Sequence, residues 1–459
     1  MLRRGEQEYF ESDEYYILLI CALAGGSAHC IATTRPDGQH VQWLNYGSGH
    51  IHGLLLNGEE QIAYERDALH REVQRHQANQ LQHSQQWDAL GRLQAQTLSK
   101  AQPASGAGAS AMPQGNAASL NIQRQYRYDQ AGQLSGIADS RRGAIQYKYD
   151  PVGRLIEAAS QLGQELFAFD PASNILDGSN RATSSNAIAA GDGSSRQGHS
   201  YNNLSGPRLL NNLLQHYAGT HYRYDERGNL IERIHNGITT SFQWNGANQM
   251  VQSRQGEHTT HYRYDPLGRR MAKVRESALN PGHSQHTLYG WDGNQLAWES
   301  TENRLTPQAQ QQLRNLRAAG RSTELPTQSG TTHYIFEPGS FVPVLQAHRA
   351  APMHQQLLQR PKDYAQHYTD AQGQYSIDAD PLFNGSFKPG SNGKSSAELH
   401  SICHYQCDHL GTPMELTDAQ GQLAWSAEYK AWGEAKVQAL WAAGRAGASS
   451  AQQVRNPLR

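Results

Sequence analysis

The chain has 459 residues, 40 Lys+Arg against 41 Asp+Glu and a formal net charge of −1, which leaves room for two or three ordinary domains or one long repeat architecture. Hydrophobic residues make up only 37% of the chain, but the small net charge argues against a disordered protein and against a cationic nucleic-acid binder. The 22 Tyr, 8 Phe and 43 Gly favour a β-rich, turn-rich protein with a part-polar interior, and exclude a coiled coil or a membrane protein.

The first 31 residues fit no repeat and are left unassigned. Residues 15–24 form the most apolar stretch, which is too short to span a bilayer. Acidic residues precede it, which is untypical of a signal peptide, so we expect a buried strand there. The 4 cysteines are too few for a disulfide framework.

A repeat begins further along the chain. Residues 126–134, 147–155, 222–230 and 262–270 share the pattern Tyr-x-Tyr-Asp-x-x-Gly, and the two residues after the glycine vary. Weaker copies are centred on Asp67, Asp88, Asp170, Asn245 and Asp292. The spacing indicates a unit of about 20 residues, which is typical of a repeat architecture.

The unit has a direct physical interpretation. Two tyrosines at i and i+2 lie on one face of a strand. Asp followed three residues later by Gly favours a type I turn, and an Asn-Gly pair such as Asn236-Gly237 favours the second turn of the unit. A single hairpin of this kind is marginal in water, so the units must stack on their neighbours.

We therefore assign the motif residues to structure and not to chemistry. The recurrence of the aspartate at every turn indicates capping, because an active site needs one constellation of residues. The structural motif residues are Trp87, Asp88, Gly91, Tyr128, Asp129, Gly132, Tyr149, Asp150, Gly153, Tyr224, Asp225, Gly228, Tyr264, Asp265, Gly268, Asp408 and Gly411.

The organisation predicted from these patterns is a single interrupted ribbon. Repeats occupy residues 32–300, with loops near 102–119 and 178–200. A helical or loop insertion follows at 301–331, then a strand block at 332–347 and an irregular polar insertion at 348–400. Residues 401–437 are rich in strand formers, and 438–459 form a C-terminal tail.

Three downstream landmarks are more specific than the repeat. They are residues 336–343 (FEPGSFVP), 405–413 (YQCDHLGTP) and 429–433 (YKAWG), the last with Lys430 at a position usually held by Asp. With these landmarks, residues 32–459 resemble the RHS (rearrangement hotspot) proteins with YD repeats, which have a teneurin-like YD shell.

The resemblance implies an all-β fold, in which a YD-repeat hairpin ribbon curls into part of a hollow, cocoon-like shell. It also implies a bacterial polymorphic toxin of contact-dependent competition, made in the cytoplasm and delivered by a secretion apparatus such as type VI. The chain ends at residues 456–459 (NPLR), which in such proteins lead into a C-terminal core block, so we expect it to be truncated before that block and the toxin.

The partners implied by the resemblance are a cargo toxin and the remaining shell segments. No nucleic acid and no cofactor are expected. Open sheet edges at the last repeat predict self-association.

Candidate catalytic and metal residues are few. Residues 403–409 hold the one Cys/His cluster, with Cys407 and His409, but this is at most half of a zinc site. We find no nucleophile elbow and no His-Glu-x-x-His motif, and predict no catalytic residue, no metal and no enzyme. Two alternatives stay open: a cell-surface module whose aromatic rings bind carbohydrate or protein, and a hydrolase that uses Cys407 or His409.

Overall fold

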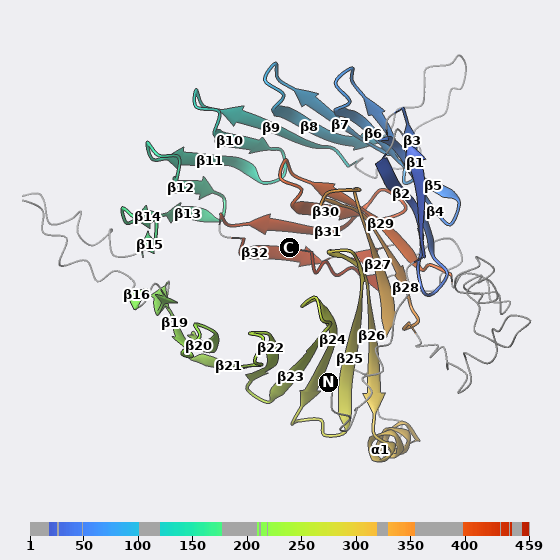
Figure 1. Ribbon diagram of the computed structural model, residues 1–459, viewed down its shortest axis with the longest axis vertical. Helices are drawn as coiled ribbons and strands as arrows, with labels where there is room; N and C mark the ends of the chain where they lie inside the picture. The colour runs from blue at the N-terminus through green and yellow to red at the C-terminus, as the bar shows by residue number, and fades with distance from the viewer. Residues whose placement is uncertain are drawn as a thin grey trace, which may run out of the picture.

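The computed structural model describes residues 18–24, 27–47, 49–100, 120–176, 209–210, 213–217, 219–318, 329–353, 398–431, 433–439, 441–442 and 452–458. These residues form 34 β-strands and one α-helix (Figure 1). The predicted loops at 102–119 and 178–200, and most of the insertion at 348–400, lie outside the described residues.

Two large antiparallel sheets contain most of the strands, and in both the order in the sheet is the order in the chain. The first sheet has 13 strands: β1 (Leu18–Ala24), β2 (Ser27–Thr34), β3 (His40–Tyr46), β4 (His50–Leu56), β5 (Glu59–Arg66), β6 (Glu72–Gln77), β7 (Leu81–Trp87), β8 (Leu93–Lys100), β9 (Ile122–Tyr128), β10 (Leu134–Asp139), β11 (Gly143–Tyr149), β12 (Leu155–Ser160) and β13 (Gly163–Leu166). The second sheet has 15: β18 (His216–Tyr217), β19 (Thr220–Tyr224), β20 (Leu230–His235), β21 (Ile238–Trp244), β22 (Met250–Gln255), β23 (His258–Tyr264), β24 (Arg270–Ser277), β25 (His283–Asp292), β26 (Gln295–Leu305), β27 (Gly330–Phe336), β28 (Pro343–Arg349), β29 (Ser401–Cys407), β30 (Pro413–Thr417), β31 (Leu423–Tyr429) and β32 (Ala435–Ala439).

Short elements complete the described chain. Three two-stranded pairs are β14 (Ala168–Phe169) with β15 (Ile175–Leu176), β16 (Leu209–Leu210) with β17 (Leu213–Leu214), and β33 (Trp441–Ala442) with β34 (Gln452–Gln453). Helix α1 (Pro307–Ala318) connects β26 to β27. The predicted boundary at residue 32 falls inside β2, and the segment between β26 and β27 is shorter than the predicted insertion at 301–331.

The ribbon curls until its end lies against its beginning. In Figure 1 the chain runs from the blue strands through teal, green and yellow, and the red strands β29–β31 then lie alongside the blue and teal ones. Side chains from both sheets form one apolar cluster, in which Trp43, Leu54 and Ile62 of the first sheet meet Ile335 and Leu345 of the second.

The two sheets use opposite faces for this contact. In the first sheet, the face that carries the motif tyrosines points to the second sheet, since the ring of Tyr126 lies 5.0 Å from that of His409. In the second sheet, His404 reaches the carbonyl of Gln61 in the first, whereas Tyr405 packs on the other face against Val454. The ribbon is therefore a scroll, with its last strands inside its first and the motif tyrosines on the inner face throughout.

Each motif turn is closed by its aspartate. Asp265 Oδ1 accepts hydrogen bonds from the backbone N–H groups of Leu267 and Arg269, at 2.9 and 2.8 Å. The N–H of Gly268 donates to the carbonyl of Asp265 at 3.0 Å, and Gly268 has a φ of 82°. Degenerate copies adopt the same left-handed conformation without glycine, for example His70 with a φ of 60°. The other motif aspartates occupy the same place in turns of this kind, at Asp88, Asp129, Asp150, Asp225 and Asp408.

Successive units are joined by the aromatic residue that precedes the aspartate. Tyr264 Oη donates to the carbonyl of Met250, and Trp244 Nε1 donates to that of Leu230, both at 2.8 Å. In each case the acceptor lies just after the preceding turn. The same bond is made by Trp87, Tyr128, Tyr149, Trp291 and Tyr429. A polar handle on the aromatic ring is thus used at most of these positions, which favours Tyr over Phe, although Phe169 and Cys407 hold the same place before Asp170 and Asp408.

A second residue of the turn was not predicted to matter. Arg269, four residues after Asp265, pairs with its carboxylate at 2.6 Å and also donates to the carbonyl of Gly293 in the next turn at 2.7 Å. In the same way, the guanidinium of Arg92 lies 4.5 Å from the ring centre of Tyr128 in the next unit. The arginine therefore joins two turns.

The departure at Lys430 also has a structural reason. Lys430 opens a turn of the same kind, since its N–H donates to the carbonyl of Glu434 and the N–H of Gly433 donates to the carbonyl of Lys430. Lys430 Nζ pairs with Glu434 at 2.7 Å. The acid and base of the motif have exchanged places, and the ion pair across the turn is kept.

Replacing Tyr264 by phenylalanine should test the bond between units. The ring stays while the bond to the carbonyl of Met250 is lost, so we expect the free energy of unfolding to fall by about 1 kcal/mol. Urea denaturation followed by tryptophan fluorescence measures it. Tyr46→Phe is the control, because this residue is 39% exposed and the contact of its hydroxyl group with His70 is long, at 3.3 Å, and open to solvent; an equal loss in both variants would contradict the assignment.

Candidate functional site

The inner face of the scroll is covered in one region and open in another. Where the end of the ribbon lies inside its beginning, Tyr64 and Tyr126 are 6% and 4% exposed. On β19, β21 and β23 the corresponding rings of Tyr222, Phe242 and Tyr262 are only half-buried. The open part of the wall thus presents aromatic side chains to the interior without packing them into a core.

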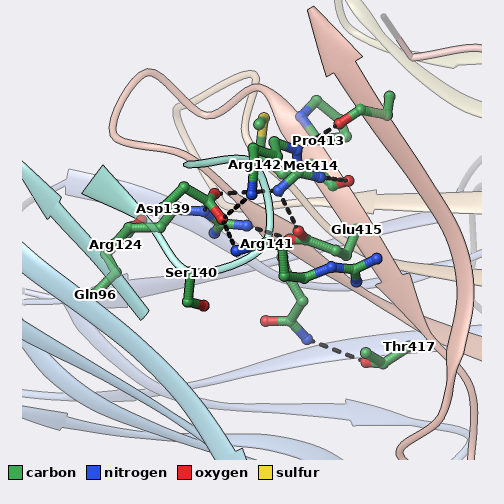
Figure 2. A network of polar contacts seen from close by, with 12 residues as sticks. Gln96, Arg124, Asp139, Ser140, Arg141, Arg142, Pro413, Met414, Glu415 and Thr417 are labelled. Carbon is green, nitrogen blue, oxygen red and sulfur yellow. Dashed lines mark hydrogen bonds and ion pairs between the residues drawn. The ribbon is translucent and has the colours of Figure 1, made fainter. Parts of the chain in front are cut away.

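A network of four charged residues joins the inner and outer layers of the scroll (Figure 2). Arg124 and Asp139 come from β9 and β10, Arg142 from the turn that follows, and Glu415 from β30 of the other sheet. Arg124 pairs with Asp139 at 2.9 Å and also with Glu415. Arg142 pairs with Glu415 at 2.6 Å and with Asp139 at 3.2 Å. Two guanidinium groups and two carboxylates balance one another in a buried site.

Backbone groups satisfy the rest of the Arg142 guanidinium. Its Nη2 donates to the carbonyl of Met414 at 2.9 Å and its Nε to that of Ala427 at 3.0 Å. The arginine therefore contacts both β30 and β31 of the inner layer. Buried charges persist only with partners of this kind, because an unpaired buried charge is strongly destabilising.

Further polar contacts extend along this contact between layers, which we call the seam. Asp37, at the start of the ribbon, accepts from His333 and from Arg349, both at 2.9 Å. Gln77 and Gln406 hydrogen-bond through their side-chain amides at 2.9 Å. The seam thus combines one apolar cluster with several buried polar pairs.

Burial and charged neighbours shift the pKa values of titratable groups at the seam and in the first sheet beside it. Burial alone would raise the pKa of Asp37, but the charges and hydrogen bonds of His333 and Arg349 outweigh it and lower the pKa to about 2. Burial would likewise raise the pKa of Glu72, and Arg75 lowers it to about 2. Burial lowers the pKa of His404 to about 4. In the folded chain the carboxylates are therefore charged and His404 is neutral.

The catalytic and metal candidates lie at the end of β29 and in the turn after it, where the ring of His409 packs against Tyr126 of the outer layer. Burial raises the pKa of the Cys407 thiol, which donates to the carbonyl of Pro343 at 3.5 Å and so stays protonated. Cys403 and His404 are neighbours on a strand and point to opposite faces. In the described ranges, no group of three or more His, Cys, Asp or Glu side chains could hold a metal ion. Within the same ranges, no helix has the length and apolar character to cross a membrane.

Replacing Glu415 by glutamine should open the seam. The change leaves two buried guanidinium groups facing one carboxylate, and we expect the free energy of unfolding to fall by about 3 kcal/mol. Thermal unfolding measures the loss. Glu157→Gln is the control, because Glu157 pairs with the exposed Lys148 at the surface and its loss should change stability far less. Equal effects of both variants would contradict a seam that depends on this network.

The pKa values also predict how stability depends on pH. The pKa of His404 lies below its ordinary value of 6.5, so its contribution is complete above pH 6.5 and is lost as the pH falls toward about 4. Asp37 and Glu72 lie below their ordinary values of 3.8 and 4.5, so their contributions are lost as the pH falls through that range toward about 2. Urea denaturation at pH 8, 6, 5 and 4 should show falling stability, with a shallower fall in His404→Gln. Constant stability from pH 8 to pH 4 would contradict the prediction.

A family model described as RHS protein matches residues 402–439, from the second residue of β29 to the end of β32. Toxin protein Tse5 of Pseudomonas aeruginosa is 33% identical over 420 residues, which are 86% of this chain and 27% of that protein. Double-stranded DNA deaminase toxin A of Burkholderia cenocepacia is 28% identical over 413 residues, or 88% of this chain and 22% of that protein. The chain therefore spans about a quarter of the length of these relatives.

A solved structure has the same fold. The Photorhabdus luminescens Tc holotoxin pore aligns with 94% of this chain and 18% of its own, with a TM-score of 0.50 and 14% sequence identity. The likeness extends over the scroll, so the expected all-β shell fold is confirmed. With its YD repeats, its scroll and the matched block at residues 402–439, the chain belongs to the RHS family.

Proposed function

We propose that this chain is a wall segment of a hollow scroll that encloses a polypeptide toxin. The observation that carries the proposal is the open inner face, where Tyr222, Phe242 and Tyr262 are half-buried on a single-layer sheet. Such rings offer contact area and polar tips without the fixed shape of a packed core. They suit a cargo that is not folded against them in one defined way.

The proposed mechanism is containment and not catalysis. Consecutive strands of each sheet are hydrogen-bonded side by side, and the bonds from residues such as Tyr264 join one unit to the next. The seam through Arg142 and Glu415 closes the wall on itself. A chain held inside would be screened from proteases and from its own targets.

The relatives support the nature of the cargo. Tse5 and the DNA deaminase of Burkholderia cenocepacia are both named as toxins, and each is about four times as long as the region it shares with this chain. By analogy, the partners would be a toxin and further shell segments, and the setting would be delivery from one bacterium to another.

Protection of an attached peptide tests the proposal. Residues 454–458 lie on the inner face against Tyr405, so a flexible peptide with several lysines fused after residue 459 starts inside the scroll. We expect trypsin to cleave it at least tenfold more slowly than the same peptide fused to an unrelated β-protein. Mass spectrometry over time measures the cleavage.

The control is the same fusion carrying Glu415→Gln, digested at a temperature at which circular dichroism still reports the folded sheet. An opened seam should restore fast cleavage. Equal, fast cleavage of the fusion with and without the substitution would refute containment by this wall.

A further inference from the structure

Strand β24 carries three cations on the inner face of the open wall. Lys273 is paired across the sheet with Tyr262, and Arg275 with Thr260, so both lie on the face of the motif tyrosines. Arg270 begins the strand, and its guanidinium lies 5.7 Å from the ring centre of Tyr262. These three residues, Arg270, Lys273 and Arg275, are called the β24 cation strip.

Aromatic rings flank the strip on both sides. The guanidinium of Arg270 also lies 5.0 Å from the ring centre of Tyr289 on β25. It is therefore held between two rings, one from each neighbouring strand. Such a cation keeps its hydrogen-bond donors available at the edge of the guanidinium plane.

Acidic side chains compensate the charge of the strip only in part. In the part of the chain that the structure describes, none of its three cations forms an ion pair, whereas the outer-face cations Arg223 and Arg304 pair with carboxylates at 3.0 and 3.1 Å. The nearby inner-face acid, Glu299, accepts a hydrogen bond from Tyr334 at 3.0 Å.

The surroundings of Lys273 reflect this excess of positive charge. Burial lowers its pKa and Glu299 opposes the change, while Arg270, Arg275 and Arg455 lower the pKa further. Arg455 belongs to the C-terminal segment that lies on the inner face, so it adds positive charge to this region from a second element. This local excess contrasts with a net charge of −1 for the whole chain.

We infer that the β24 cation strip binds a carboxylate-rich stretch of the enclosed polypeptide. The inference rests on the proposed function and names the chemistry of the partner at one place on the wall. Guanidinium groups bind carboxylates through two parallel hydrogen bonds, and the exposed Arg270 and Arg275 lie on either side of the half-buried Lys273. The half-buried ring of Tyr262 would cover apolar parts of the bound chain, while the buried ring of Tyr289 holds Arg270 in place.

Aromatic rings with cations are also typical of surfaces that bind single-stranded nucleic acid. Such surfaces carry basic residues along a groove that follows the backbone. Here three cations cluster on one strand, and the inner-face positions beside them include Thr260, Thr287 and Gln285. The arrangement favours a short acidic peptide segment over an extended phosphate backbone.

Fluorescence anisotropy with the full chain tests the inference. The probes are labelled peptides of ten residues, rich in Glu, in Lys or in Gln with Ser, and a labelled fifteen-nucleotide oligo-dT. We expect the Glu-rich peptide to bind at least tenfold more tightly than the others, and a rise in NaCl from 50 to 500 mM to weaken it. The double variant Lys273→Gln/Arg275→Gln should lose at least tenfold in affinity for it.

Arg263→Gln is the matched control. Arg263 follows Tyr262 on β23, so its side chain lies on the opposite face of the sheet, and it is exposed. It should bind the Glu-rich peptide as the unchanged chain does. Circular dichroism and thermal unfolding of all variants separate lost binding from lost folding. The double variant Lys273→Glu/Arg275→Glu should reverse the charge preference, so that the Lys-rich peptide binds more tightly than the Glu-rich peptide.

The outcomes separate this inference from the proposed function. Equal binding of all peptides, unaffected by the double variant, overturns the β24 cation strip but leaves containment intact. Tighter binding of oligo-dT that depends on Lys273 and Arg275 overturns the peptide as partner. A failed protease-protection assay with intact binding of the Glu-rich peptide would overturn containment alone.

Discussion

The hydrogen bond from an aromatic side chain to the carbonyl beyond the preceding turn is the interaction on which the scroll depends. Tyr264 makes it to Met250, and Tyr149 makes it to Leu134. The bond places a ring over the neighbouring unit and satisfies its polar end at the same time. Because each unit fixes the next, a sheet of a single layer keeps its course without a second layer to pack on.

A wall built in this way needs little apolar volume, which gives the low hydrophobic fraction of 37% its structural meaning. Apolar clusters occur where layers meet, as at Leu54 and Leu345. Elsewhere the arginines that join turns, such as Arg269, replace apolar packing by charge and hydrogen bonding. The same economy leaves the inner face amphipathic and open, which is the property that the proposed containment requires.

The sequence predicts the local structure well because turns are local. Asp at the first position and Gly at the fourth predict the turn at Asp265, and the Tyr-x-Tyr spacing predicts a shared face. The arginine four residues after the aspartate was visible at Arg154 and Arg269 but was not interpreted. The sequence does not predict which face of the sheet points inward. Side chains alternate between the two faces every second residue, and this alternation shows which residues share a face but not which face is the inner one. The seam could not be predicted from the sequence either, because Arg124 and Glu415 are 291 residues apart in the chain.

The polar character of the seam follows from the task of closing a repetitive ribbon. Units that resemble one another offer many similar registers, and an apolar contact alone would distinguish them poorly. A shift of one residue along a strand turns every side chain to the other face, so Glu415 would leave Arg124 and Arg142 without partners. The cost of those unpaired buried charges penalises the wrong register much more than a displaced methyl group would. We therefore regard the four charged residues as the element that selects where the scroll closes, while the apolar cluster around Trp43 supplies contact area once that register is reached.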